Sequence, residues 1–144
     1  TVVVVPTRSV PEGFASLLAF DPKTDAESNL ITMSDAAKEV LPGEVTRAVR
    51  SSETPAGKVE EGDWIGLDRE GVCAISKTIA EAAIGLLDKL IGPDHELVTV
   101  IAGEGSSESC TKEISEWLSE VKQNIEIEIH AGRQPLYPYY FGVE

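Results

Sequence analysis

Four residues near the end of the chain, His130, Gly132, Arg133 and Gln134, have the types and spacing of an anion-binding turn. A histidine can change charge near neutral pH and donate a hydrogen bond to an anion. A glycine lets the backbone approach a ligand closely, and arginine and glutamine side chains add donors. The run therefore predicts a ligand-binding site, with His130, Gly132 and Gln134 as binding residues. The alternative is a polar turn between two antiparallel strands.

Two arginines earlier in the chain, Arg47 and Arg50, are the other basic groups that could meet an anion. They lie in residues 44–50, where the side chains alternate as in a β-strand. We place Arg50 with the candidate ligand-binding residues. The alternative is that both arginines neutralise carboxylates of the protein itself.

Other site chemistries match the sequence poorly. Residues 103–108, GEGSSE, have the place of a phosphate-binding loop, between a predicted strand and a predicted helix. Glu108, however, stands where GxGxxG needs its third glycine, and no GxxxxGK[ST] run exists. His95 and His130, the only histidines, have no zinc-ligand spacing, and no GxSxG motif occurs. The sequence thus predicts no catalytic residue, metal or cofactor in this chain.

Composition and charge restrict the partners. The net charge is -13, with 25 acidic and 12 basic residues spread along the chain. Such a surface repels nucleic acids and anionic membranes, and no apolar run approaches the roughly 20 residues of a membrane span. Two cysteines, Cys73 and Cys110, form no disulfide framework and are expected to be partly buried fillers in a reduced, cytoplasmic setting.

Periodicity predicts alternating strands and helices that must position these residues. Strands are expected over residues 1–5, 44–50, 64–68, 72–75, 97–102 and 125–130, with a last strand in the tail. In residues 125–130 three isoleucines, the last of them Ile129, alternate with polar residues and are expected on the buried face. Helices are expected over residues 10–20, from Thr24 to a stop at Pro42–Gly43, from a Ser76 cap to Gly92–Pro93, and around residues 114–121. The first two begin at capping-box spacing, with Ser9 and Glu12 in one and Thr24 and Glu27 in the other, and the last two each carry an apolar face. Residues 51–57 are expected to be a loop. Pro135 and Pro138 place the first half of the last strand at an edge or in a bulge.

This order of elements indicates an α/β fold, with α+β as the alternative, in which helices pack on a mixed β-sheet. The chain starts TVVVVPT and has Met33 as its only methionine. We therefore expect it to be part of a longer protein.

Several stretches resemble one family. VVVVPTRSVPEGFASLLAFDP, GEVTRAVR, EEGDWIG and GRQPLYPYYFGVE occur in the order found in the C-terminal region of the fatty acid kinase A subunit, which is also called dihydroxyacetone-kinase-like. The resemblance covers essentially the whole chain. It implies a DegV-like fold, with residues 1–42 as the end of a first lobe and residues 43–144 as the second lobe.

The resemblance also implies partners and cofactors. ATP and Mg²⁺ would bind an N-terminal kinase domain of the same protein, and a DegV-type protein would present the fatty acid that is phosphorylated. His130-Ala131-Gly132 is similar to the H-x-G turn near the ligand head group of DegV-type proteins. DegV-type proteins continue with a small, glycine-rich stretch, whereas the residues from Arg133 to Pro138 in this chain are bulkier. Kinase subunits also usually have a glycine at the position of Arg133.

This bulk would close a lipid cavity, with Leu136, Tyr137, Tyr139 and Phe141 filling the space. The leading hypothesis is therefore a non-catalytic scaffold or regulatory domain that contacts the kinase, a second copy or the acyl-carrying partner. The alternative is that the domain itself binds a fatty acid or a small anion. A third hypothesis is that phosphoryl transfer in the whole protein needs groups from this domain.

Overall fold

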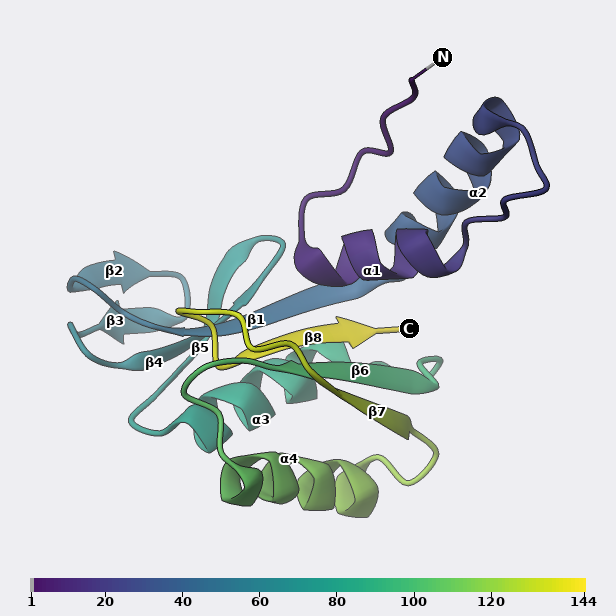
Figure 1. The fold of residues 1–144 in the computed structure, drawn as a ribbon. Helices are drawn as coiled ribbons and strands as arrows, with labels where there is room; N and C mark the ends of the chain where they lie inside the picture. The colour runs from purple at the N-terminus through teal and green to yellow at the C-terminus, as the bar shows by residue number, and fades with distance from the viewer. Residues whose placement is uncertain (1) are drawn as a thin grey trace.

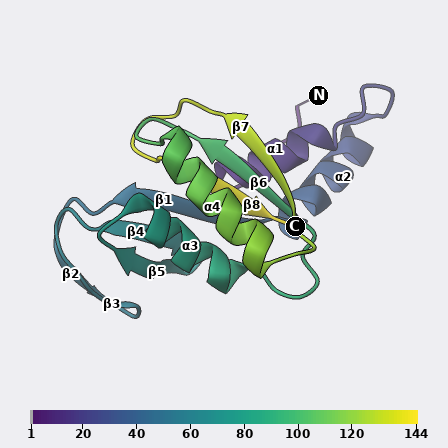
Figure 2. The ribbon, with the colours of Figure 1, turned by 90° about the horizontal axis from the view of Figure 1, so that it is seen from below.

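The computed structural model describes residues 2–144 and places a six-stranded β-sheet at the centre, with helices on both faces (Figure 1). α1 and α2 form a hairpin above the sheet in that view, and α3 and α4 lie below it. Figure 2, seen from below, shows α3 and α4 side by side across the lower face. The helices are α1 (Val10–Leu18), α2 (Ala26–Glu39), α3 (Ile79–Leu90) and α4 (Glu108–Val121). The strands are β1 (Leu41–Arg47), β2 (Ser52–Thr54), β3 (Gly57–Val59), β4 (Trp64–Asp68), β5 (Gly71–Ser76), β6 (Leu97–Ala102), β7 (Glu126–Ala131) and β8 (Tyr139–Val143).

The sheet is mixed, which confirms the predicted fold class. Its order is β5-β4-β1-β8-β6-β7, and all neighbours are antiparallel except β6 and β7, which are parallel. Parallel neighbours need a crossover connection, and α4 supplies it. β8 comes last along the chain but lies in the middle of the sheet. β2 and β3 form a separate two-stranded ribbon.

Two glycines on the central strands show how closely the helices approach from opposite sides. A Cβ atom on Gly43 of β1 would lie 2.8 Å from a carbon of Leu90 and 3.0 Å from one of Leu86, both in α3. A Cβ atom on Gly142 of β8 would lie 3.3 Å from Pro11 of α1. Glycine at these positions therefore lets helices pack close to the backbone of the sheet.

The main core lies between the sheet and the α3–α4 layer. Tyr139 and Phe141 of β8 are fully buried there, and their rings stack with centroids 5.7 Å apart. The predicted apolar faces of α3 and α4 supply most of the opposing side chains. Those fully or almost fully buried are Ala82, Ala83, Leu86, Leu87, Ile114 and Leu118. Of the four tail residues predicted to close a lipid cavity, Tyr139 and Phe141 are buried and Tyr137 is partly buried, but Leu136 is 79% exposed in a loop. That the buried rings take the place of a lipid stays a prediction.

The strand predicted over residues 1–5 is not present in residues 2–5, and Thr1 lies outside the described residues. Val2 and Val4 are 91% and 79% exposed. A β-branched run favours an extended chain, but a strand also needs a neighbour to satisfy its backbone hydrogen bonds. No segment of residues 2–144 supplies that neighbour.

The start of α2 differs from the predicted capping box. Asp25 is the N-cap, and its carboxylate accepts hydrogen bonds from the amides of Glu27 and Ser28, both at 3.0 Å. Thr24 instead donates its hydroxyl to Asp21. Aspartate is the stronger cap here because it also places a negative charge at the positive end of the helix.

Pro42 and Gly43, predicted to stop α2, belong to β1 instead. α2 already ends at Glu39, and Val40 is extended, with φ -82° and ψ 128°. Proline is tolerated in β1 because β4 pairs with this strand only from Glu44 onward, so one side of the strand is unpaired at Pro42. The predicted lobe boundary after residue 42 falls inside β1, and the division into lobes stays a prediction.

The cap predicted for α3 is also displaced. Ser76 remains in β5, and Thr78 caps α3 by accepting a hydrogen bond from the amide of Glu81 at 3.3 Å. The Ser76 hydroxyl donates to the carboxylate of the same glutamate.

Two strand predictions need correction. The β2–β3 ribbon lies where a loop was expected, because three-residue strands carry no alternating pattern long enough to recognise. β7 is an edge strand, so Ile129, expected to be buried, is 50% exposed. Both Pro135 and Pro138 precede β8, which is central and begins at Tyr139.

Candidate functional site

The predicted ligand turn belongs to residues 132–138, a loop that connects β7 to β8 across the end of β6. β7 and β8 run antiparallel, as the alternative interpretation of this segment expects, but β6 lies between them, so the connection is a loop and not a tight hairpin turn. The amides of Gly132 and Arg133 both donate to the carbonyl of Ala102, at 2.8 and 3.1 Å. The amide of Glu104 donates to the Gln134 carbonyl at 2.8 Å. The loop is therefore tied to the chain that leaves β6.

Gln134 fills the space beside Gly132 that the sequence assigns to a ligand. Its Nε2 donates to the carbonyls of Ile101 and Tyr137, at 3.0 and 3.1 Å. A Cβ atom on Gly132 would collide with Gln134 Oε1 and with the Ile101 side chain. One on Gly103 would collide with the Tyr137 carbonyl oxygen and would lie 2.6 Å from the amide carbon of Gln134. Both glycines are thus needed for close approach, and Gln134 is the residue that approaches both.

One polar atom in this cluster has no partner. The Oε1 atom of Gln134 is buried and accepts no hydrogen bond from any residue in the described range 2–144. An unsatisfied buried acceptor costs about 1–3 kcal/mol. The two bonds made by Nε2 hold the side chain in place despite this cost.

His130 is on a different surface from the Gln134 amide. It lies on β7, and its ring centroid is 5.4 Å from that of Phe14 in α1. Its Nε2 lies 3.6 Å from the carboxylate of Glu128, so a protonated imidazole would be paired within the same strand. The side chain is 45% exposed and faces the α1 side of the sheet, where an anion would also meet Glu128.

Arg50 lies in a groove of about 410 Å³ between the β2–β3 ribbon and the residue 132–138 loop. Arg47, Leu136 and Tyr137 line the same groove, which we call the arginine groove. Its remaining lining residues are Thr46, Ala48, Val49, Ser52, Val59, Ile65 and Val72. The structure therefore brings Arg50 to the far end of the same loop as Gln134 but does not place it with His130.

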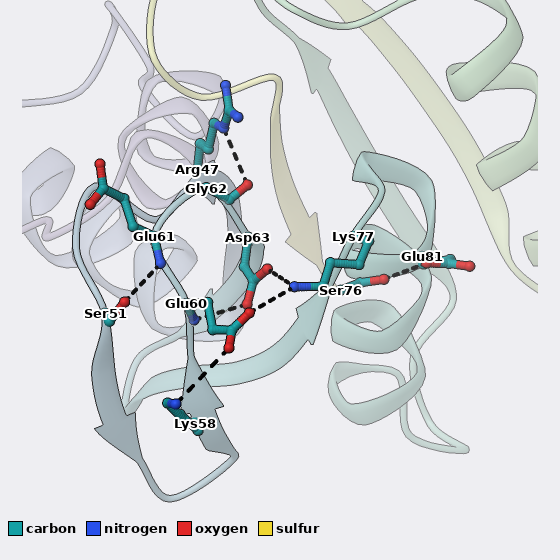
Figure 3. Close-up of polar contacts among 10 residues, drawn as sticks. All are labelled: Arg47, Ser51, Lys58, Glu60, Glu61, Gly62, Asp63, Ser76, Lys77 and Glu81. Atoms are coloured by element: carbon teal, nitrogen blue, oxygen red, sulfur yellow. Dashed lines mark hydrogen bonds and ion pairs between the residues drawn. The ribbon is translucent and has the colours of Figure 1, made fainter.

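Arg47 is oriented by its neighbours. Its Nε donates to the carbonyl of Gly62 at 3.2 Å, and its guanidinium carbon lies 5.9 Å from the ring centroid of Trp64. Figure 3 shows the guanidinium pointing away from the carboxylates below it. Arg47 and Arg50 form no salt bridge with any carboxylate among residues 2–144, contrary to the alternative considered from sequence.

A separate polar cluster holds the base of the β2–β3 ribbon (Figure 3). The buried Asp63 carboxylate lies 2.6 Å from Lys77 Nζ and accepts the amide hydrogen bond of Glu60 at 2.9 Å. The hydrogen bond from Lys77, with that from the Glu60 amide, lowers the pKa of Asp63. The backbone carbonyl of Asp63 accepts a hydrogen bond from the amide of Ala48 at 2.8 Å. Sequence reasoning missed this pair, because Lys77 is 14 residues from Asp63 and no local pattern connects them.

Sequence reasoning also missed a pair that attaches α1 to the sheet. Glu12 is predicted as the second residue of a capping box, and Ser9 does accept its amide hydrogen bond at 3.3 Å. Its buried carboxylate, however, accepts from Arg69 of the β4–β5 turn at 3.0 Å and from the Arg8 amide at 2.6 Å. Arg69 also donates to the Val40 carbonyl at 2.7 Å. No sequence signal connects Glu12 with a residue 57 positions away.

The remaining titratable core groups are held in neutral form. Burial raises the pKa of Cys73 to about 11 and also raises the pKa of Cys110, so both are half-buried thiols at neutral pH. Burial raises the pKa of Tyr139 to about 12. Its hydroxyl lies 2.6 Å from that of Thr111. No group of three His, Cys, Asp or Glu side chains in residues 2–144 could hold a metal ion. Within the same range, every helix is too short or too polar to cross a membrane.

Comparison with known proteins agrees with the sequence resemblance. The model of the FakA-like C-terminal family, which describes C-terminal domains like that of the fatty acid kinase A subunit, matches residues 1–144. The chain is 38% identical over 143 residues to Protein YloV of Bacillus subtilis, and 34% identical over 142 residues to an uncharacterized protein of Staphylococcus epidermidis. An uncharacterized Staphylococcus aureus protein is 30% identical over 142 residues. In each case the match covers 99% of this chain and 26% of the relative, so the chain spans about a quarter of the relatives' length. With a family match over its entire length, the chain belongs to the C-terminal domains of the FakA-like, or fatty acid kinase A-subunit-like, family.

Proposed function

We propose that this domain is a non-catalytic scaffold or regulatory domain in the ATP-dependent phosphorylation of a fatty acid. The family match supports a place in a fatty-acid-kinase-like protein. ATP and Mg²⁺ would bind a kinase domain elsewhere in that protein. A DegV-type protein would present the fatty acid, and the domain would contact one or both of these components in the cytoplasm.

The observation that carries the proposal is an exposed apolar surface on α1, α2 and the chain before them. Seven of the eleven large hydrophobic residues exposed in the described chain lie between residues 2 and 31. They are Val2, Val4, Val10, Leu17, Leu18, Phe20 and Ile31. Exposed apolar side chains that concentrate in one part of a soluble protein often contact another protein. We assign this surface, named the α1 face, to the kinase part of the protein.

A binding experiment tests this assignment. The purified chain is mixed with the kinase domain of its own protein, and complex formation is followed by light scattering after gel filtration. We expect a one-to-one complex with the wild-type chain and at least a tenfold weaker one with Leu17→Asp/Leu18→Asp. Ile129→Asp, a control at an exposed isoleucine on β7, should bind like wild type. Equal binding by all three proteins would contradict the assignment to the α1 face.

A second candidate function, binding of a fatty acid by the domain itself, has one supporting observation. A cavity of about 290 Å³ lies between α1 and the sheet, lined by Phe14, Leu18, Val40 and Leu97 among others. Phe14 contacts the His130 ring, so His130 would be near the head group. Glu128 and Glu144 also line this cavity and would repel a carboxylate.

Native mass spectrometry with palmitate distinguishes the two functions. A one-to-one lipid complex that is lost in His130→Ala would favour ligand binding by this domain. If wild type shows only the lipid-free mass at saturating palmitate, fatty-acid binding by this domain would be excluded. The third hypothesis, a direct contribution to phosphoryl transfer, predicts that deleting the domain from the whole protein lowers turnover and spares ATP binding.

A further inference from the structure

The arginine groove differs in charge from the rest of the molecule. The chain carries 25 acidic and 12 basic residues, yet none of the eleven residues that line the groove is acidic and two are arginines. Glu53, the nearest acidic residue along β2, lies opposite Lys58 in the β2–β3 ribbon and does not line the groove. The groove is thus a local positive site on an acidic surface, where an anion would be attracted against the overall field.

Its two arginines are available to carboxylates. Arg47 uses Nε for the Gly62 carbonyl, and its two Nη groups make no hydrogen bond to residues 2–144. Arg50 is exposed, and its side chain makes no hydrogen bond or salt bridge within the same range. A guanidinium can pair with a carboxylate through two parallel hydrogen bonds. The contact of the Arg47 guanidinium with the Trp64 ring restricts the side-chain conformation of Arg47 before any partner binds.

An apolar side chain is held at the rim in a strained conformation. Leu136 has φ 68°, and the Tyr137 amide donates to the Pro135 carbonyl at 2.8 Å across it. This is the γ-turn with positive φ, which is rare and costly for a residue with a Cβ atom. Thr46 fixes the turn by donating its hydroxyl to the Leu136 carbonyl at 2.8 Å, and Tyr137 stacks on Tyr140 at 5.1 Å. The result is a leucine that is 79% exposed beside the two arginines.

We propose that the arginine groove is the docking site for an acidic segment of the DegV-type partner, with Arg47 and Arg50 pairing its carboxylates and Leu136 and Val49 contacting an adjacent apolar side chain. The assignment rests on the proposed function, because it presumes that the domain contacts this partner. Charge complementarity selects an acidic occupant. A protein segment fits better than a free lipid because Val49 and Leu136 are 85% and 79% exposed, whereas small ligands are usually largely enclosed.

The test measures binding of the chain to the purified DegV-type protein of the same organism by isothermal titration calorimetry. We expect Arg50→Glu to weaken binding at least tenfold. Lys112→Glu is the matched control, since it makes the same change in net charge at an exposed position of α4, on the opposite face of the sheet. It should stay within twofold of wild type. Wild-type binding should also weaken as NaCl is raised.

Leu136→Gly separates contact from folding. Glycine adopts φ 68° without strain, so the melting temperature should be unchanged or higher. The loss of the side chain should nevertheless weaken binding at least fivefold. A variant that is equally stable and binds like wild type would overturn the role of Leu136.

The outcomes distinguish the groove from the proposed function. If wild type binds the partner and Arg50→Glu and Leu136→Gly bind equally well, the assignment of the groove as the docking site is overturned, but partner binding by the domain stands. Failure of wild type to bind overturns the DegV contact, and the groove assignment falls with it. If sedimentation shows that wild type is a dimer and that Arg50→Glu is a monomer, the groove would be assigned to contact with a second copy of the chain. Sodium octanoate that binds wild type but not Arg50→Glu, without partner binding, would assign it to a small carboxylate.

Discussion

α1 and α3 pack on opposite faces of the same sheet, but they direct their large side chains differently. α3 buries Leu86 and Leu87 completely. The residues that α1 buries are Pro11, Glu12, Ala15 and Ser16, and it exposes Leu17 and Leu18 at 69% and 72%. A helix with an apolar stripe usually turns it toward its own core. α1 therefore turns mainly polar and small residues toward the sheet, and its two exposed leucines are available for the partner contact proposed above.

The contacts that hold the two layers also differ in kind. The α3–α4 side is held by apolar burial around β8. On the α1 side, Glu12 meets Arg69, and the Ser16 hydroxyl donates to the Met33 carbonyl at 2.9 Å. Polar contacts fix geometry but contribute less net stability than a large apolar core. We therefore expect the α3–α4 side to dominate the free energy of unfolding and the α1–α2 hairpin to be the first part to open.

The largest expected difference comes from a pair of leucine truncations. Leu86→Ala should lower the free energy of unfolding by about 3 kcal/mol, because it leaves a cavity in the α3–α4 core. Leu18→Ala should change it by about 0.5 kcal/mol or less, since the side chain is already exposed. Urea denaturation followed by circular dichroism measures both. Comparable losses would mean that α1 packs against the sheet more fully than its exposure indicates.

The next effect concerns the attachment of α1. Glu12→Ala removes hydrogen bonds from Arg69 and the Arg8 amide and should cost about 2 kcal/mol, within the range for charged partners. Glu39→Ala, at an exposed acidic residue of α2, is the control and should stay within about 0.5 kcal/mol. Hydrogen exchange should show faster opening of α1 and α2 and unchanged protection of α3. Protection lost equally in α3 would contradict separate opening.

Tyr139 tests a polar contact on the apolar side. Tyr139→Phe should cost about 1 kcal/mol, because the Thr111 hydroxyl loses its partner. In the wild type, burial raises the pKa of Tyr139 from 10.0 to about 12. As the pH rises, Tyr139 therefore loses its proton in the unfolded protein before it does so in the folded protein. The contribution of this difference to the free energy of unfolding is complete below pH 10 and is lost as the pH rises toward about 12. This alkaline loss should be smaller in Tyr139→Phe when melting temperature is followed against pH, and an identical profile would exclude Tyr139 as its source.

The smallest effect concerns the loop that joins β7 to β8. Arg133 has φ 56°, a left-handed conformation that favours glycine. Arg133→Gly should raise the free energy of unfolding by up to about 1 kcal/mol. Arg8→Gly, at an exposed arginine outside any helix or strand with no positive φ, should not stabilise. A decrease in Arg133→Gly measured by urea denaturation would show that the arginine side chain makes a contact that outweighs the strain.

Sequence periodicity predicted the parts of the fold that are set by apolar burial. The stripes of α3 and α4 and the apolar run of β6 identify a buried face directly, because each repeat matches its secondary structure. The order of strands could not be predicted, since any of several pairings would bury the same faces. The missed caps at Asp25 and Thr78 lie one and two residues from the predicted ones, where several capping residues compete.

The candidate site was predicted less completely, for a physical reason. Donor-rich residues such as Gln134 were recognised by type, but their partners depend on the tertiary path of the chain. Gln134 meets the carbonyl of Ile101, 33 residues away, and Leu136 meets Thr46, 90 residues away. The left-handed φ of Arg133 was not predicted either, although the glycine that is usual in the family at that position is compatible with it.

The central place of β8 has a consequence for synthesis of the domain on the ribosome. β5, β4 and β1 can pair with one another as soon as they emerge, and β6 can pair with β7 once α4 has folded between them. These two groups share no strand pairing until β8 is made, because β8 alone is bonded to both β1 and β6. Until then the apolar sides of β1 and β6 lack their neighbour, and such unpaired edges invite aggregation or capture by chaperones. Completion of the sheet thus awaits the emergence of β8 from the ribosomal tunnel.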